Sequence, residues 1–415
     1  MSQSPFRRFL VRLRRRYSRP TLFIAAMVIL AMYICFLLFF GDGDAVSLWR
    51  LAELNTCPAC YGTSVCPELY SNLIQLDPKN RKWFNAKNVF YGSTRFNSSF
   101  VLKKLAHHSE FKEFDRALCG QFNLQSPCTS KLLNVGVEEK ILKSVEYNVE
   151  SPPSEPRKGL IMCPNADSIF NFIAPVFSMN GNHQAELMNI YTMLSLNPEP
   201  IILKVLRKSK GWLVPGYAGV CGRLEVVTYE GKPLSDMIHV QWYRKLYYSL
   251  QILQAGIDFT LKHKRYRFYL MDWSLDNIVV DHRDIITFVD LEDVIVLDKN
   301  VSPKVGKLDW TKRHSHEDTP GFSFSIQNIC KYHFSDHNLW AACYIIAGDD
   351  NPLLTPIPKR VMQSTPKLQK LLNNCLHQND RLHSAISLTR LMYDLLKTEK
   401  VGGYGVNRTT TLRNW

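Results

Sequence analysis

The pattern of apolar and polar positions between residues 268 and 293 predicts a β-hairpin flanked by polar loops. Two short apolar, β-branched segments are joined by the charged turn 281–284. Asp272 and Asn277 precede the first strand, and Asp290 follows the second. Because a hairpin brings its two ends back together, Asn277 and Asp290 are predicted to present oxygen atoms to one small, hard cation.

The letters HRD at His282, Arg283 and Asp284 fall inside that turn and imitate part of a catalytic-loop motif. The residue five positions after Asp284 is Val289, which cannot bind magnesium, so the three residues are predicted to form only a polar turn. Asp272 passes the same test because an asparagine stands five residues after it. Asp272 is therefore placed to accept a proton from an attacking hydroxyl group.

A strand, a polar turn at 93–99 and a second strand are predicted over residues 85–105. The second of these strands carries Lys103 shortly after Val101. This order resembles the strand of protein kinases whose lysine binds the α- and β-phosphates of a nucleotide. Lys104, the next residue, is the alternative candidate for this phosphate-binding lysine. A lysine on a strand is also common as a solvated edge residue.

Residues 184–196 carry apolar side chains at helix-compatible spacing and are predicted to form a helix that begins near Glu186. In a kinase-like fold this helix would be the regulatory one, and Glu186 would hold Lys103 through an ion pair. The alternative is an ordinary exposed glutamate that the helix macrodipole favours.

The segment 200–230 is predicted to form strands, the first of them at 201–206. Tyr229 and Glu230 end the segment and stand where a linker between two lobes would let adenine meet backbone groups. A long amphipathic helix is predicted over 240–262, directly before the opening hairpin. Further helices are predicted at 336–346 and within 364–396, and residues 106–181 are interpreted as a cystine-tied insertion without clear periodicity.

Composition and charge distribution exclude one class of function. The chain has 415 residues, 46% of them hydrophobic and 12% aromatic, which is typical of globular proteins. The net charge is +14, but seven arginines fall in residues 1–19 with no acidic residue before Asp42. The remainder shows no Lys/Arg stripe, so nucleic acid is not expected as a partner.

Residues 21–40 carry no charge and are long enough to cross a bilayer core as a helix. A cleaved signal peptide is the alternative, but its apolar region would be shorter and followed by a small-x-small site. Arginines precede the segment and Asp42 and Asp44 follow it, so the positive-inside rule predicts a single-pass type II anchor with its N-terminus in the cytosol. The C-terminal part would then be lumenal, and cleavage near 41–45 would release a secreted form.

Cysteine usage agrees with an oxidising lumen. Ten of the eleven cysteines lie outside the apolar segment and are predicted to form disulfides, with the pairing left open. Cys57, Cys60 and Cys66 are interpreted as a structural disulfide knot; a zinc site or a thioredoxin-like redox pair is the alternative. The sequons at Asn97, Asn300 and Asn407 would be usable for glycosylation in a lumen.

Lys103, Glu186, Asp272, Asn277 and Asp290 occur in the order and approximate spacing of a protein-kinase catalytic set. Other segments closely resemble the divergent protein kinase domain family of the secretory pathway, in particular its type 2 subgroup. They are the Cys57-Pro-Ala-Cys60 knot with the following Tyr-Gly-Thr, Val101-Leu-Lys103, Asn197-Pro-Glu-Pro200 and the run Asp336-His-Asn-Leu. The similarity covers about residues 51–396.

The resemblance implies an α+β, two-lobed protein-kinase-like fold that is tied by disulfides and stands behind an N-terminal transmembrane helix. The expected parts are a basic cytosolic tail (1–20), the anchor (21–40), a lumenal stem with the cysteine knot (41–83), an N-lobe with the insertion (84–230), a C-lobe (231–400) and a tail (401–415).

The resemblance also implies ATP and Mg²⁺ or Mn²⁺ as cofactors. Asn277 and Asp290 would hold the metal, and Lys103, Tyr229 and Glu230 would contact the nucleotide. Asp272 would act in catalysis together with Lys103 and Glu186. The expected partner is a secretory-pathway or extracellular protein that serves as substrate or receptor.

Several positions depart from the kinase pattern. Leu270 and Met271 replace the His and Arg of the catalytic loop, Ser274 replaces its Lys, Glu292 lies where a Gly would follow the metal Asp, and no G-x-G-x-x-G precedes the strand lysine. Two hypotheses therefore stand. The chain is a lumenal kinase that transfers phosphate to a hydroxyl group, or it is a pseudokinase that acts as a secreted or membrane-anchored scaffold.

Overall fold

The computed structural model describes most of the chain from residue 48 onward. The described residues are 28, 30, 48–77, 88–120, 125–126, 128, 136–146, 159–176, 183–301, 309–310, 326–349, 351–377 and 380–398. Apart from Val28 and Leu30, the predicted anchor at 21–40 lies outside them, as does the tail at 401–415. None of the helices in this described part is both long enough and apolar enough to cross a bilayer.

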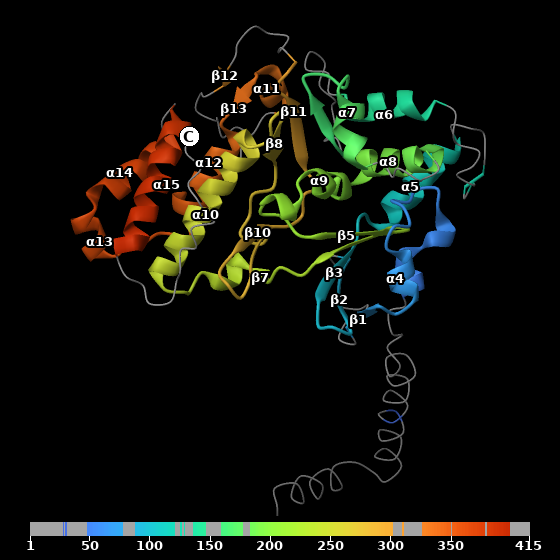
Figure 1. The fold of residues 1–415 in the computed structure, drawn as a ribbon, viewed down its shortest axis with the longest axis horizontal. Helices are drawn as coiled ribbons and strands as arrows, with labels where there is room; N and C mark the ends of the chain where they lie inside the picture. The colour runs from blue at the N-terminus through green and yellow to red at the C-terminus, as the bar shows by residue number, and fades with distance from the viewer. Residues whose placement is uncertain are drawn as a thin grey trace, which may run out of the picture.

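An antiparallel sheet of five strands forms one side of the molecule (Figure 1). Its strands run in the order β1-β2-β3-β6-β5, and the antiparallel β2–β3 pair confirms the two strands predicted within 85–105. The strands are β1 (Ile74–Leu76), β2 (Val89–Thr94), β3 (Ser99–Lys104), β5 (Tyr217–Cys221) and β6 (Leu224–Thr228).

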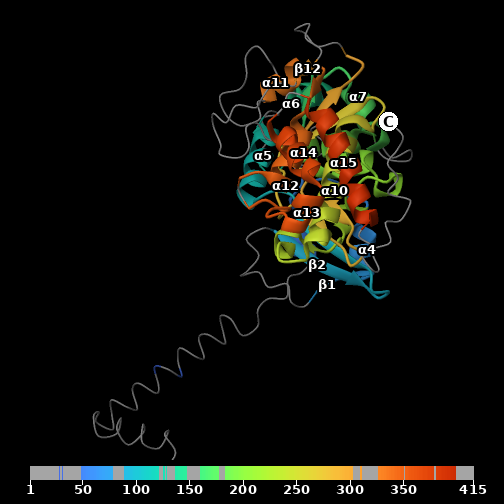
Figure 2. The same ribbon diagram turned by 90° about the vertical axis from the view of Figure 1, so that its left-hand side faces the viewer.

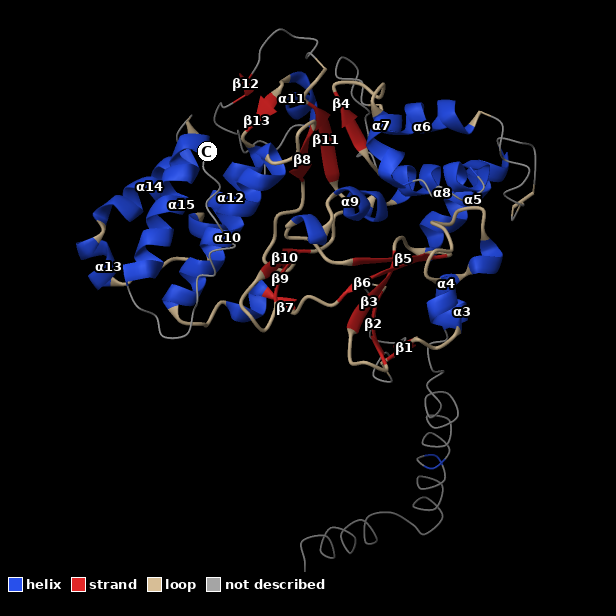
Figure 3. Cartoon of the chain, in the orientation of Figure 1, coloured by secondary structure: helices blue, strands red, loops and turns tan. Residues whose placement is uncertain are grey.

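The two faces of this sheet have different roles because side chains alternate along a strand. Leu102 and Val226 face α3 (Leu48–Ala52) and α4 (Cys66–Tyr70), where they join a small apolar core that includes Leu69. Lys103 therefore points to the opposite face. That face meets the rest of the protein, as the cartoon in Figure 3 shows.

Helices lie on the side of this second face. They are α5 (His108–Gly120), α6 (Val137–Val145), α7 (Ile169–Ile173), α8 (His183–Leu196) and α9 (Glu199–Val205). Helix α9 packs against β5 and in turn contacts α7 and α8. Helix α8 confirms the helix predicted at 184–196. Helices α5 to α7 lie in the region without clear periodicity, where no helix was predicted.

The strand predicted at 201–206 is wrong, because this segment forms α9. Residues 199–203 are all buried, so the helix has no polar face and its apolar run resembles a buried strand. Pro200 lies in the first turn, where a missing N–H is tolerated. The amide oxygen of Asn197 accepts a hydrogen bond from the Glu199 N–H at 3.0 Å and so fixes the helix start.

The C-terminal part is built around helices that pack together on the other side of the molecule (Figures 1 and 2). They are α10 (Trp242–Leu261), α12 (His337–Ala347), α13 (Lys359–Ser364), α14 (Pro366–His377) and α15 (Arg381–Thr398). These helices confirm the ones predicted at 240–262, at 336–346 and within 364–396. The chain crosses from the large sheet to this part through residues 229–231.

Small sheets lie between the large sheet and these helices. Strands β7 (Lys232–Pro233), β9 (Ile278–Val280) and β10 (Ile286–Phe288) form one of them, and β4 (Ile161–Cys163), β8 (Tyr266–Leu270) and β11 (Val294–Asp298) form another. Two shorter strands pair beside α11 (Ile326–Lys331): β12 (Asp309–Trp310) and β13 (Phe334–Ser335).

The predicted hairpin at the start of the C-terminal part is confirmed. Strands β9 and β10 are antiparallel, with Ile278 opposite Phe288. The HRD look-alike is its turn, because the Asp281 carboxylate accepts hydrogen bonds from the Arg283 and Ile285 N–H groups. Asp284 is buried beneath the turn and is not part of the cleft.

All ten predicted cysteines form disulfides, which confirms the interpretation of Cys57, Cys60 and Cys66 as a structural knot. The five bonds are Cys57–Cys60, Cys66–Cys221, Cys119–Cys128, Cys163–Cys330 and Cys343–Cys375. The pairing required the fold, since four of the five bonds join cysteines that are not neighbours in the knot.

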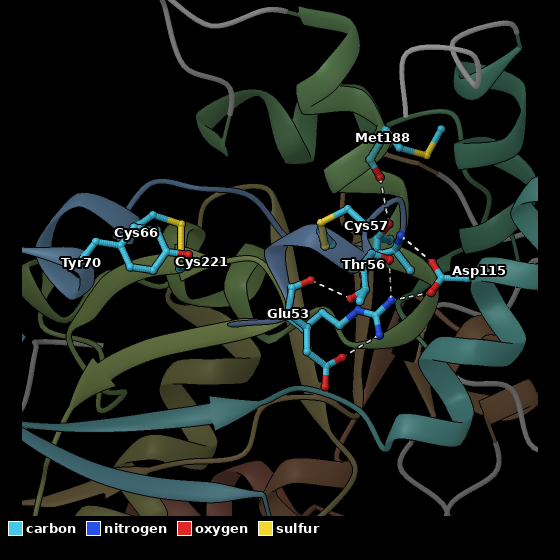
Figure 4. The surroundings of a disulfide bond; sticks show 12 residues. Glu53, Thr56, Cys57, Cys66, Tyr70, Asp115, Met188 and Cys221 are labelled. Atoms are coloured by element: carbon cyan, nitrogen blue, oxygen red, sulfur yellow. Dashed lines mark hydrogen bonds and ion pairs between the residues drawn. A yellow bond between two sulfur atoms is a disulfide. The ribbon is translucent and has the colours of Figure 1, made fainter. Parts of the chain in front are cut away.

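A buried charged network surrounds the knot, as Figure 4 shows. Arg223 is 2% exposed and forms ion pairs with Asp115 and Glu53. It also donates hydrogen bonds to the carbonyl oxygens of Thr56 and Ala59, at 3.1 and 3.2 Å. The knot therefore supplies backbone acceptors that fix a buried arginine at the end of the β5–β6 hairpin.

Candidate functional site

A cleft of about 910 Å³ lies between the large sheet and the β9–β10 hairpin. Its lining includes six of the seven residues predicted for the site: Lys103, Tyr229, Glu230, Asp272, Asn277 and Asp290. Glu186 is not among the lining residues. Glu199, at the start of α9, lines the cleft instead.

The upper part of the cleft is organised by an ion pair between Lys103 and Glu199. The Lys103 ammonium lies 2.8 Å from both carboxylate oxygens of Glu199, and Glu199 is completely buried. The same ammonium lies 3.5 Å from the Oδ1 atom of Asp290. This ion pair therefore connects the sheet, α9 and the loop after the hairpin.

The pairing corrects the expectation that Glu186 holds Lys103. Helix α8 packs against α6, whereas α9 packs against β5 and brings Glu199 to the strand lysine. The charge of Glu186 acts on Lys204, where it opposes the lowering of the lysine pKa by burial. The Asn197-Pro-Glu-Pro200 segment was the available signal for Glu199, but the sequence pattern did not show that a helix begins there.

The structure also shows that the two adjacent lysines, Lys103 and Lys104, have different ion-pair partners. Lys104 forms an ion pair with Glu53, on the stem side of the sheet. Burial acts to lower the pKa of Lys103, but Glu199 first, and then Asp290 and Glu225, outweigh burial and raise the pKa above its ordinary value. Lys103 is therefore held as a cation in the cleft.

The hairpin places the lower residues. The Val289 N–H donates to the Asn277 carbonyl at 2.9 Å, which brings Asp290 beside Asn277. The amide nitrogen of Asn277 donates to Asp272 at 2.6 Å, so its amide oxygen is the atom that could ligate a metal. Asp290 has a φ of 66°, a conformation uncommon for a residue other than glycine and often found at functional sites.

The lower cleft has an excess of carboxylates. Burial raises the pKa of Asp272, the Asn277 hydrogen bond opposes this, and the charge of Asp290 adds to it. Burial raises the pKa of Glu292 to about 7, helped by the charges of Asp290 and Asp293. Glu292 also accepts a hydrogen bond from Asn197 at 2.7 Å, so it connects the loop after the hairpin to the start of α9.

The linker residues Tyr229 and Glu230 differ in their exposure to solvent. Glu230 turns inward, where it pairs with Lys208 and is 8% exposed. Tyr229 is 41% exposed and meets Tyr91 edge to face, with ring centroids 5.9 Å apart at the mouth of the cleft. Gly231 adopts a φ of 117°, and a Cβ there would lie 1.8 Å from the Val280 carbonyl oxygen, so the linker passes against β9 only as glycine.

Helix α12 supports the loop that carries Asp272, a contact that the sequence interpretation missed. Asn338 accepts a hydrogen bond from the Leu270 N–H at 3.1 Å and donates to the Phe268 carbonyl at 2.7 Å. A ring nitrogen of His337 bonds the Leu270 carbonyl at 2.8 Å. Both side chains are completely buried, so α12 fixes the backbone two residues before Asp272.

Replacing Asn338 by alanine is expected to destabilise the chain by about 2–3 kcal/mol, because it leaves the Leu270 N–H and the Phe268 carbonyl buried without their partner. Urea unfolding of the full chain would measure the loss. Asn373→Ala, at an exposed position of α14, is the matched control and should change stability by less than about 0.5 kcal/mol. Equal effects of the two variants would contradict this account.

The charged and polar groups of these residues are suited to a nucleotide that binds together with a divalent cation. Lys103 supplies a fixed cation for phosphate oxygens, and Asp290 and Asn277 supply the oxygen ligands that magnesium prefers. In the described part of the chain, no three His, Cys, Asp or Glu side chains form a ready-made metal site.

A family model described as the protein-kinase domain of FAM69 matches residues 190–378. Divergent protein kinase domain 2A of Xenopus tropicalis is 25% identical over 395 residues, which cover 88% of this chain and 92% of that protein. The human protein of the same name is 25% identical over 362 residues, covering 80% of this chain and 84% of its own length. Mouse divergent protein kinase domain 2B is 23% identical over 235 residues, with coverage of 52% and 53%.

The mixed α/β fold, the cleft and the family-model match define a kinase-like domain. The chain is similar to the protein-kinase domain of FAM69 over residues 190–378 and to divergent protein kinase domains 2A and 2B, and these similarities support a divergent protein kinase family. The family resemblance stated from the sequence is thereby confirmed.

Proposed function

We propose that this protein is an atypical kinase that transfers phosphate from ATP to a hydroxyl group of a secretory-pathway substrate. The observation that carries the proposal is the convergence of two halves of one site. Lys103, held by Glu199, lies 3.5 Å from Asp290, and Asp290 adjoins Asn277 and Asp272 in the same cleft.

Each residue has a role that its surroundings support. Lys103 orients the phosphates, because Glu199 holds its ammonium between the sheet and the hairpin. Asn277 and Asp290 would hold Mg²⁺ or Mn²⁺, which when bound offsets the charge of the transferring phosphoryl group. Asp272 accepts the proton of the attacking hydroxyl, and its hydrogen bond to Asn277 fixes its direction.

The cellular setting belongs to the same proposal. Five disulfides are typical of proteins that mature in an oxidising compartment. The uncharged segment 21–40, preceded by arginines, supports a type II anchor with the kinase-like domain in the Golgi or ER lumen. Asn97, in the exposed turn between β2 and β3, would be accessible to glycosylation there.

The charge of the cleft favours a second candidate, a pseudokinase scaffold. Asp272, Asp276, Asp290, Glu292 and Asp293 line the lower cleft, whereas Lys103 and Lys104 are the lysines that line it and both are already paired. Such a cleft repels an anionic nucleotide unless divalent cations accompany it. The two candidates therefore differ in whether metal-dependent nucleotide binding occurs.

Purified full-length protein should be stabilised by ATP only when Mg²⁺ or Mn²⁺ is present, by about 2.7 kcal/mol at a ligand concentration of 100 times Kd. Asp290→Asn should abolish this stabilisation and the transfer of the γ-phosphate, because it removes the carboxylate ligand. Asp349→Asn, an exposed change at the end of α12, should behave as wild type. Nucleotide stabilisation without transfer would favour the scaffold, and no metal-dependent stabilisation would exclude the proposed kinase.

A further inference from the structure

Glu225 is a buried carboxylate that the proposed mechanism does not use. It lies on β6, is completely inaccessible to solvent, and is not among the residues that line the cleft. Neither of its carboxylate oxygens has a hydrogen-bond partner within the described residues. Burying a carboxyl group without a hydrogen-bond partner lowers the stability of the fold, so the position of Glu225 requires an explanation.

The sheet register places Glu225 beside Lys103. The two residues are directly opposite each other on the antiparallel strands β3 and β6. Side chains of directly opposed residues project from the same face of a sheet, about 5 Å apart at Cβ. The Glu225 carboxylate therefore lies on the face that carries Lys103, behind the cleft rather than in it.

The charges around Glu225 identify Lys103 as the cation available to it. Burial raises the pKa of Glu225, Glu199 and Asp290 raise it further, and Lys103 opposes them. In the structure, Lys103 is engaged by both oxygens of Glu199. One ammonium thus stands between a carboxylate on α9 and a second carboxylate on β6.

We propose that Glu225 is a second, competing partner of Lys103 and acts as a positioning residue for the nucleotide site. When Glu199 holds the ammonium, Lys103 faces the cleft and Glu225 is left without a partner. When Glu199 disengages through a shift of α9, Glu225 takes the ammonium and withdraws it from the cleft. This inference rests on the proposed nucleotide site for its consequence, but the exchange of partners itself needs no nucleotide.

The test is a double-variant cycle that follows the reactivity of the Lys103 amine. Full-length protein without nucleotide is treated with an amine-reactive N-hydroxysuccinimide ester, and acylation of Lys103 is quantified by mass spectrometry. Glu225→Gln alone should leave the labelling rate unchanged, because Glu199 still holds the ammonium. Glu199→Gln alone should raise the rate by less than about threefold, because Glu225 captures the lysine. Glu199→Gln with Glu225→Gln should raise it by about tenfold or more.

A double variant that labels at the rate of Glu199→Gln alone would overturn the proposal. The melting temperature gives a second readout if labelling is obscured by unfolding. The loss in the double variant should exceed the sum of the single losses, because only the double variant leaves Lys103 without a carboxylate partner in the sheet or on α9. Additive losses would count against the second partner.

The consequence for nucleotide binding is tested separately. Glu199→Gln should weaken the binding of ATP with Mg²⁺, because Glu225 then withdraws the ammonium, and adding Glu225→Gln should recover about threefold of the lost affinity. No recovery in a chain that does bind ATP would show that Glu225 does not position Lys103. A chain that binds no ATP would overturn the proposed kinase function, and the labelling cycle would still decide the role of Glu225.

Discussion

Replacing Asp272 by asparagine is expected to slow phosphate transfer by at least about a hundredfold, the lower end of the contribution of a general base. Nucleotide affinity should remain close to that of wild type. Asp272 lines the cleft, and its carboxylate accepts a hydrogen bond from the Asn277 amide nitrogen at 2.6 Å. Asparagine keeps the size of the side chain but cannot accept the proton of the attacking hydroxyl. Single-turnover transfer and nucleotide Kd would separate the two effects.

Asp236→Asn is the matched control for this change. Asp236 is exposed on η6 (Leu234–Met237). It lies three residues after Pro233, which lines the cleft, but does not line the cleft itself. It should transfer phosphate at the wild-type rate. If Asp272→Asn also transfers phosphate at that rate, another group must accept the proton and the assignment of Asp272 fails.

Replacing Arg223 by leucine is expected to lower the free energy of unfolding by about 3–5 kcal/mol, the cost of breaking a buried ion pair on one side. The variant leaves the Asp115 carboxylate, 5% exposed, without its cation. It also removes donors from the carbonyl oxygens of Thr56 and Ala59 around the cysteine knot. Urea unfolding under non-reducing conditions would measure the loss with all disulfides intact.

Arg283→Leu is the matched control, since it removes the same charge from an exposed ion pair. The Arg283 side chain is 67% exposed and pairs with Asp281 in the β9–β10 turn. Such surface pairs contribute about 0–1 kcal/mol. Comparable losses for the two arginine variants would show that burial of the Arg223 network does not stabilise the fold.

The lower half of the site was accessible from the sequence because its geometry is local. A two-strand alternation interrupted by a charged turn is sufficient to predict a hairpin, and a hairpin fixes which residues meet at its ends. Asn277 and Asp290 were therefore identified without knowledge of the rest of the fold. The same reasoning dismissed the HRD look-alike at 282–284, which the structure places in the turn.

The upper half was only partly accessible. The strand lysine was found, but its partner was assigned to Glu186 and is Glu199. The first five residues of α9 are all buried, so its sequence shows no amphipathic period and resembles a strand. Which glutamate reaches Lys103 depends on how α8 and α9 pack against the sheet, and no local pattern carries that information.

By itself the sequence determined the β2–β3 hairpin, helices α8, α10 and α12, the oxidised state of ten cysteines and the β9–β10 hairpin with its three polar residues. These features follow from periodicities of two and 3.6 residues and from residue chemistry, which act over short stretches of chain. Tertiary structure alone decided the disulfide pairing, the ion pair of Lys103 with Glu199, the support of the Asp272 loop by α12 and the burial of Glu225. Those contacts join residues far apart in sequence, and packing rather than local preference selects them.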